Sequence, residues 1–134
     1  MKCYLILLLP FFICFSCTPS PIEKSFSGTD SVVIFFKNET AGIITKTVQT
    51  TEKNAISRIV DFIDKDKTQL FDCGYDGKIY FFDNGKKIQE VDFKVKDKTC
   101  NHFAFLLNNR LVSTKMSFEA IDFLTALEKG ELFY

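Results

Sequence analysis

Three short turn signals divide the second half of this chain into segments rich in aromatic and β-branched residues. Asp76-Gly77 and Asn84-Gly85 are dipeptides that tolerate positive φ at both central positions of a type I′ hairpin. Asn108-Asn109 is a third candidate for a tight turn. Segments joined by such short connections leave no room for crossover helices, so they pair antiparallel. This feature favours an antiparallel sheet over a parallel α/β fold.

The expected strands share alternating or continuous runs of β-branched and aromatic side chains, to which the 16 Phe of the sequence contribute. They are predicted over residues 31–37, 43–49, 69–73, 78–83, 86–95, 101–107 and 110–114. The first is continuously apolar, which is typical of a strand buried on both faces. In the last hairpin, Phe105 is predicted to lie opposite Val112.

The predicted register of the middle hairpin assigns its apolar side chains to faces. With Asn84-Gly85 as a two-residue loop, Phe82 pairs with Lys87 and Tyr80 with Gln89. One face then carries Tyr80, Phe82, Val91, Phe93 and Val95, and the other carries Ile79, Phe81 and Ile88 with Glu90 and Asp92. The first face is the cleaner core face. The second set becomes an exposed apolar patch if both helices cover the first face, and becomes core if the helices lie on opposite faces or the N-terminal strands fold across.

Two segments have the 3.6-residue periodicity of amphipathic helices. In the first, of about 14 residues, a capping Thr50 or Thr51 precedes an apolar stripe. In the second, Ser117 is the expected N-cap and Gly130 lies at the exit. The two stripes are Ile56, Ile59, Val60, Ile63 and Ala120, Ile121, Leu124, Leu127. The sequence therefore predicts an α+β fold, with an antiparallel sheet of about five to seven strands, mostly a meander, and two amphipathic helices.

The N-terminal segment has the composition of an export signal. Lys2 supplies one positive charge, and residues 3–17 are apolar except for Ser16. The run is shorter than a membrane span and is interrupted by Pro10. We predict a signal peptide over residues 1–16, then a lipidated cysteine and a flexible Pro- and Ser-rich tether over 17–30, and a single domain over 31–134.

The apolar run ends in Cys14-Phe15-Ser16-Cys17, which resembles the lipobox of bacterial lipoproteins. The resemblance implies that the Cys17 thiol is diacylated, for example with palmitate, and becomes the first residue of the mature chain. The bilayer of the cell membrane or outer membrane is then a partner, with the domain on the periplasmic or extracellular side. Cys14 and Phe15 depart from the usual pattern, where Leu and a small residue are commonest. The alternative is an ordinary signal peptide cleaved nearby, which leaves Cys17 as a plain thiol.

The cysteine count predicts a disulfide. Of the five cysteines, Cys3 and Cys14 leave with the signal and Cys17 carries lipid, so Cys73 and Cys100 remain as a pair in an exported domain. In a flat meander two strands would separate them. The bridge therefore requires loops that curl over the sheet end, or a different strand order. The alternative is a redox or metal site, which the lack of a CxxC spacing and the presence of one histidine disfavour.

The sequence contains few candidates for catalysis. His102 is the only histidine, and its alternation with Phe103 and Phe105 predicts a partly exposed strand residue. The carboxylates that could form an acid–base pair are Asp72, Asp76, Asp83 and Glu90. Turns or strand surface explain three of these four, and the sequence has no Gly-rich phosphate loop, GxSxG or HExxH motif. We therefore predict no catalytic residue, no metal and no cofactor.

The densest cluster of the sequence is Cys73-Gly74-Tyr75-Asp76-Gly77. With Cys100 and the two predicted helices, it resembles small lipoproteins of Bacteroidota-type bacteria, which carry a CGYDG-like turn, a later cysteine and a short C-terminal helix. The resemblance covers roughly residues 50–128 and implies no activity. In the alternative interpretation, the two glycines serve turn geometry, Tyr75 packs on the disulfide, and nothing binds there.

Two classes of function follow from these features. The 17 basic and 17 acidic residues leave no net positive charge for binding nucleic acid. The favoured class is a membrane-tethered, non-enzymatic binding or inhibitor/immunity-type module for an unknown protein partner. Its candidate contact residues are Tyr75, Asp76, Ile79, Phe81 and Ile88. The alternative is a small cell-envelope hydrolase or isomerase that uses carboxylates near the turns at residues 72–83.

Overall fold

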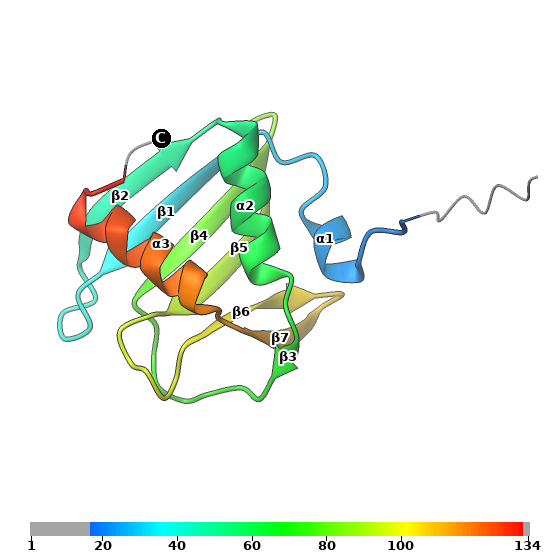
Figure 1. Cartoon of the computed structure of the whole chain (residues 1–134). Helices are drawn as coiled ribbons and strands as arrows, with labels where there is room; N and C mark the ends of the chain where they lie inside the picture. The colour runs from blue at the N-terminus through cyan, green and yellow to red at the C-terminus, as the bar shows by residue number, and fades with distance from the viewer. Residues whose placement is uncertain (1–16, 133–134) are drawn as a thin grey trace, which may run out of the picture.

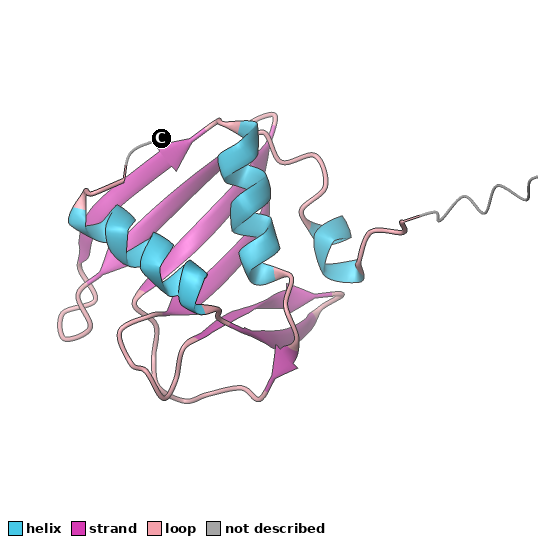
Figure 2. Ribbon diagram, in the orientation of Figure 1, coloured by secondary structure: helices cyan, strands magenta, loops and turns pink. Residues whose placement is uncertain are grey.

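A computed structural model describes residues 17–132 and contains a seven-stranded antiparallel sheet with three helices (Figures 1 and 2). The predicted α+β class is confirmed. The predicted signal peptide lies outside the described residues. The elements in chain order are α1 (Pro21–Ser25), β1 (Ser31–Lys37), β2 (Ile44–Thr50), α2 (Lys53–Ile63), β3 (Lys67–Thr68), β4 (Gly77–Asp83), β5 (Lys86–Lys94), β6 (His102–Leu107), β7 (Arg110–Lys115) and α3 (Phe118–Lys129).

The strand order across the sheet is β2-β1-β4-β5-β6-β7-β3. Strands β4 to β7 form the predicted meander, and β1 inserts between β2 and β4. The predicted strand over residues 69–73 is wrong. These residues form a loop because β3 pairs with β7 at one edge, whereas β4 pairs with β1 and β5 near the centre. The intervening chain has to return from the edge and cannot join the sheet.

Two of the three predicted turns are confirmed. Asn84 and Gly85 have φ values of 49° and 76°, and Asn108 and Asn109 have values of 51° and 61°. The third dipeptide, Asp76-Gly77, is not a turn, because Gly77 begins β4. A Cβ atom at Gly77 would overlap the Phe93 ring and the Phe35 carbonyl, so close packing and not positive φ requires glycine there.

A β-bulge determines which side chains of β4 and β5 face the core. The pair of Phe82 with Lys87 is as predicted, but the register then shifts by one residue and Tyr80 lies opposite Glu90. The shift places apolar side chains of both strands on one face and charged side chains on the other. The core face carries Ile79, Phe81, Val91 and Phe93, and the opposite face carries Lys78, Tyr80, Glu90 and Asp92.

The predicted assignment of faces is therefore wrong for β4. Ile79 and Phe81 are buried, with exposed fractions of 1% and 0%, and Ile88 is half-buried against the same core. The apolar patch considered for these three residues does not form. The reason is that, without the bulge, Glu90 and Asp92 would share the apolar face and could not pair with Lys78 on the other.

Helices α2 and α3 cover the same face of the sheet, as Figure 1 shows. The rings of Phe62 in α2 and Phe123 in α3 lie 5.3 Å apart and join the two helices. The predicted α2 stripe is buried throughout, and in α3 only Ile121 stays half-exposed. Ser117 caps α3 and Gly130 ends it, as predicted, whereas the α2 cap position is Glu52 and its side chain makes no capping bond.

The predicted flexible tether is wrong for most of its length. Residues 21–25 form α1, whose N-cap Ser20 donates a hydrogen bond to the Asp64 carboxylate at the end of α2. Ile22 and Phe26 are buried, and the Phe26 ring lies 4.6 Å from that of Phe81. Two apolar side chains separated by one helical turn gave this segment enough burial to fold onto the core.

Candidate functional site

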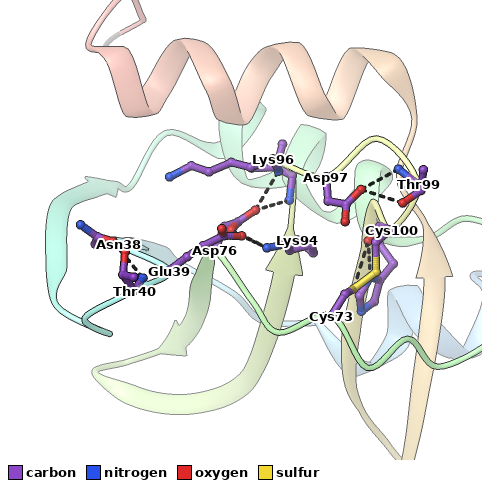
Figure 3. Close-up of polar contacts among 12 residues, drawn as sticks. Asn38, Glu39, Thr40, Cys73, Asp76, Lys94, Lys96, Asp97, Thr99 and Cys100 are labelled. Carbon is purple, nitrogen blue, oxygen red and sulfur yellow. Dashed lines mark hydrogen bonds and ion pairs between the residues drawn. A yellow bond between two sulfur atoms is a disulfide. The ribbon is translucent and has the colours of Figure 1, made fainter.

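The predicted disulfide between Cys73 and Cys100 is present. Cys73 lies in the loop before β4 and Cys100 in the loop before β6, and the Cα atoms are 6.7 Å apart. Both loops curl over the same end of the sheet, which is one of the two ways in which the bridge could form (Figure 3). The disulfide therefore closes this end of the domain.

A buried ion pair lies beside the disulfide (Figure 3). The Lys94 ammonium donates to the Asp76 carboxylate at 3.1 Å and also pairs with Glu39 from the loop between β1 and β2. Asp76 is fully buried, and Lys94 is 4% exposed. The second Asp76 oxygen accepts bonds of 2.7 Å from the backbone N–H groups of Val95 and Lys96. The carboxylate thus holds β4, β5 and the following loop together.

Two predicted binding residues therefore have different surroundings from those expected. The Asp76 carboxylate is fully buried and bonds to Lys94 and to two backbone N–H groups, which removes it from the candidate binding surface. Tyr75 is half-buried, and its ring lies 5.7 Å from the His102 ring. Burial, followed by the charges of Asp92 and Asp72, raises the pKa of the Tyr75 hydroxyl.

His102 is fully buried and not partly exposed as predicted. The sequence alternation correctly places His102 on the other face of β6 from Phe103. The loop before β4 covers this face with the rings of Phe71 and Tyr75. Its Nδ1 lies 2.7 Å from the Cys100 carbonyl oxygen. Its Nε2 is buried without a hydrogen-bond partner. The sequence places this histidine two residues after Cys100, but its position beside Cys73 depends on the fold of the loop before β4.

A cavity of about 560 Å³ opens above the disulfide. Its lining includes Cys73, Tyr75, Lys94 and Lys98. At its rim, hydrogen bonds from the side chain and backbone of Thr99 lower the pKa of the Asp97 carboxyl. The cavity is lined by charges of both signs, and it gives solvent access to the half-buried Cys73.

The outer face of the sheet, opposite α2 and α3, carries an aromatic cluster. Phe35 and Tyr80 have ring centroids 5.3 Å apart, and those of Tyr80 and Phe82 are 6.4 Å apart. Val33 pairs with Tyr80 and completes this group, which we call the outer-face cluster. All four side chains are half-buried. Strand β1 alternates between buried and partly exposed residues, so the prediction that it is buried on both faces is wrong.

Charged side chains border the outer-face cluster. Lys78 pairs with Glu90 and, at 3.5 Å, with Asp92, while Lys87 lies 2.7 Å from Glu90 and over the Tyr80 ring. Hydrogen bonds from Lys78 and then Lys87 lower the pKa of the Glu90 carboxyl. Paired lysine and carboxylate side chains therefore border the aromatic side chains of the cluster.

The four carboxylates considered for catalysis do not share one set of partners. Asp76 bonds to Lys94 and two backbone N–H groups, whereas Glu90 bonds to Lys78 and Lys87. Asp83 accepts a hydrogen bond from Asn84, and Asp72 is exposed in the loop before β4. No two of these four carboxylates share a hydrogen-bond partner among the contacts described here.

Comparisons with known proteins return no protein-family model, no curated protein and no solved structure that matches this chain. Within residues 17–132, no helix is both long and apolar enough to cross a membrane. Cys17 is exposed and is not part of the disulfide.

Proposed function

We propose that this chain is an exported, lipid-anchored protein that binds a protein partner through the outer-face cluster and does not act as an enzyme. The observation that carries the proposal is the arrangement of the sheet. Both long helices lie on one face, and Val33, Phe35, Tyr80 and Phe82 gather on the other. The binding surface thus differs from the residues that the sequence suggested, because the bulge exchanges the faces of β4.

The composition of the outer-face cluster favours a protein as the partner. Interfaces between proteins combine an aromatic centre with a polar rim, and tyrosine is enriched in their centres. Tyr80 supplies an aromatic ring at the centre, and Lys78, Lys87 and Glu90 supply a rim of both signs. This balance suits a protein surface better than a polyanion, for which an excess of basic side chains is needed.

The folded N-terminal segment affects how the domain would sit at a membrane. Only Thr18 and Pro19 separate Cys17 from Ser20, which is bonded to Asp64. Three residues span at most about 10 Å. If Cys17 carries the acyl chains, the domain lies against the membrane surface, and the partner is expected to be in, on or near the same membrane.

Photo-crosslinking from the outer face tests the binding proposal. We expect a photoreactive phenylalanine analogue in place of Phe82, in the full chain expressed in its native cells, to give one protein adduct of defined mass. Because Phe35 and Phe82 belong to the same cluster, adding Phe35→Ser should remove this adduct. The measurement is immunoblotting of irradiated cells, with the melting temperature of each variant recorded.

The matched control position is Asp122, which is exposed on α3 on the other side of the sheet. The analogue at this position should give no such adduct. Equal adducts from both positions, no adduct from position 82, or an adduct that persists with Phe35→Ser in a folded protein would each reject the outer-face cluster as the binding surface.

A further inference from the structure

We propose that Cys73, Cys100 and His102 form a binding site for a thiophilic d¹⁰ cation, Zn²⁺ or Cu⁺, when the disulfide is reduced. The two cysteine sulfur atoms and a ring nitrogen of His102 all lie within 4.8 Å of one another. Two thiolates and one imidazole are a ligand set that both cations bind. The site lies at the closed end of the sheet and does not depend on the outer-face cluster.

The hydrogen bond of His102 determines which of its ring nitrogens can act as a ligand. A carbonyl oxygen only accepts hydrogen bonds, so the 2.7 Å contact with the Cys100 carbonyl assigns the proton to Nδ1 and leaves a lone pair on Nε2. Among the described residues, this Nε2 and Ser113 Oγ are the buried side-chain atoms that lack a hydrogen-bond partner. Metal-binding histidines typically direct their second N–H to a carbonyl or carboxylate, which fixes the ring orientation.

The unpartnered Nε2 atom of His102 destabilises the fold, and a bound cation would remove this penalty. His102 is fully buried, and a buried acceptor without a partner destabilises the fold. The rings of Phe71 and Tyr75, at 5.1 and 5.7 Å from the imidazole, exclude water from it. An apolar shell of this kind controls solvent access to a metal site and the dielectric around it.

The site also has a route of entry. Cys100 is 5% exposed, but Cys73 is half-buried and lines the cavity of about 560 Å³. Cys73 lies in the loop between β3 and β4, outside any strand. A reductant and a cation can therefore approach the Cys73 sulfur from the cavity, while Cys100 lies just before β6 and His102 begins it.

The chemistry requires two balanced steps. A dithiol transfers two electrons and two protons to the Cys73–Cys100 disulfide and is itself oxidised to a disulfide. The cation then displaces the two thiol protons and binds both sulfur atoms and Nε2 of His102. Three protein ligands leave one coordination position for water or an exogenous ligand, as in catalytic zinc sites and not in structural ones.

The test uses a chain that begins at Thr18, which contains every described helix and strand and has Cys73 and Cys100 as its only cysteines. The protein is reduced with a dithiol, freed of reductant without oxygen, and titrated separately with Zn²⁺ and Cu⁺. Because His102 is the only histidine, its ¹⁵N resonances are unambiguous. We expect one equivalent of at least one cation to bind and to shift Nε2, while the Nδ1 proton is retained.

Two controls separate this site from a simple pair of thiols. The oxidised protein should not bind, and His102→Gln in the reduced protein should weaken binding by at least about tenfold, the lower end of the loss seen when even an outer-shell partner of a metal is removed. Circular dichroism follows the fold throughout. If the reduced protein loses structure, recovery of the native spectrum on adding the cation supports the site.

Three results would overturn the proposal. They are an Nε2 resonance that does not move when the cation binds, equal affinity in the reduced wild type and His102→Gln, and failure of both cations to bind or to restore the fold. The separate titrations identify the cation. None of these outcomes bears on the outer-face cluster, which is tested by crosslinking.

Discussion

Asp76→Ala is expected to lower the free energy of unfolding by about 3–5 kcal/mol, because it leaves a buried ammonium without its buried partner. The carboxylate is fully buried and accepts hydrogen bonds from Lys94 and from the backbone of Val95 and Lys96. Glu39 remains near Lys94, but its side chain is 53% exposed and cannot replace the two backbone contacts. Urea denaturation followed by circular dichroism measures the change.

The matched control for this prediction is Asp72→Ala. Asp72 is an exposed carboxylate four positions earlier in the same loop, so its removal should change the free energy by no more than about 0.5 kcal/mol. A loss below about 1 kcal/mol for Asp76→Ala would contradict the structural role of the buried pair. It would mean that water or another group satisfies Lys94 when the carboxylate is gone.

Phe81→Ala is expected to cost about 3–5 kcal/mol, the usual loss for removing a fully buried phenylalanine. The side chain has no exposed surface and packs against Phe26, 4.6 Å away between ring centroids. The cavity left by the ring would also loosen α1 from the sheet. The measurement is again the free energy of unfolding from urea denaturation at neutral pH.

Phe82→Ala is the matched control, because it removes the same side chain from the next residue on the opposite face. Phe82 is half-buried, so the expected loss is about 1 kcal/mol, in proportion to the smaller apolar area that it buries. If the two substitutions have equal effects, or Phe82→Ala has the larger one, the observed register of β4 and β5 is contradicted, and with it the position of the outer-face cluster.

The parts of the fold that could be predicted from the sequence are those set by local interactions. Asn84-Gly85 and Asn108-Asn109 form the expected turns because few residues tolerate positive φ at both central positions. Ser117 and Gly130 mark the ends of α3 for similarly local reasons. From these turns the antiparallel meander of β4 to β7 follows, and with it the α+β class.

The features that could not be predicted depend on contacts between distant segments. The Asn84-Gly85 turn does not indicate the one-residue shift between Phe81 and Phe82, yet this shift exchanges the two faces of β4. It is favoured because it brings Lys78 beside Glu90 and Asp92 and buries Ile79 with Val91. The position of β1 beside β4 is equally non-local, as is the packing of Phe26 on Phe81.

The candidate sites likewise combine features that the sequence predicts with features that depend on contacts between distant segments. The count of cysteines was enough to predict the Cys73–Cys100 bridge. The position of His102 beside it depends on the loop before β4 folding over the end of β6. The Asp-Gly dipeptide predicts a turn at Asp76, but the Asp76 carboxylate instead bonds to a buried lysine 18 positions later.

Cys17 is the residue on which a role at the membrane depends, and its acylation is directly measurable. The full chain is expressed in a lipoprotein-processing bacterium and labelled with an alkyne-bearing fatty acid, with Cys14→Ser as the matched control. We expect label on the wild type and on Cys14→Ser, and none on Cys17→Ser, because the lipid is attached through the Cys17 thiol. Equal labelling of the wild type and Cys17→Ser, or no labelling of the wild type, would contradict the proposal that this protein is held at a membrane by lipid.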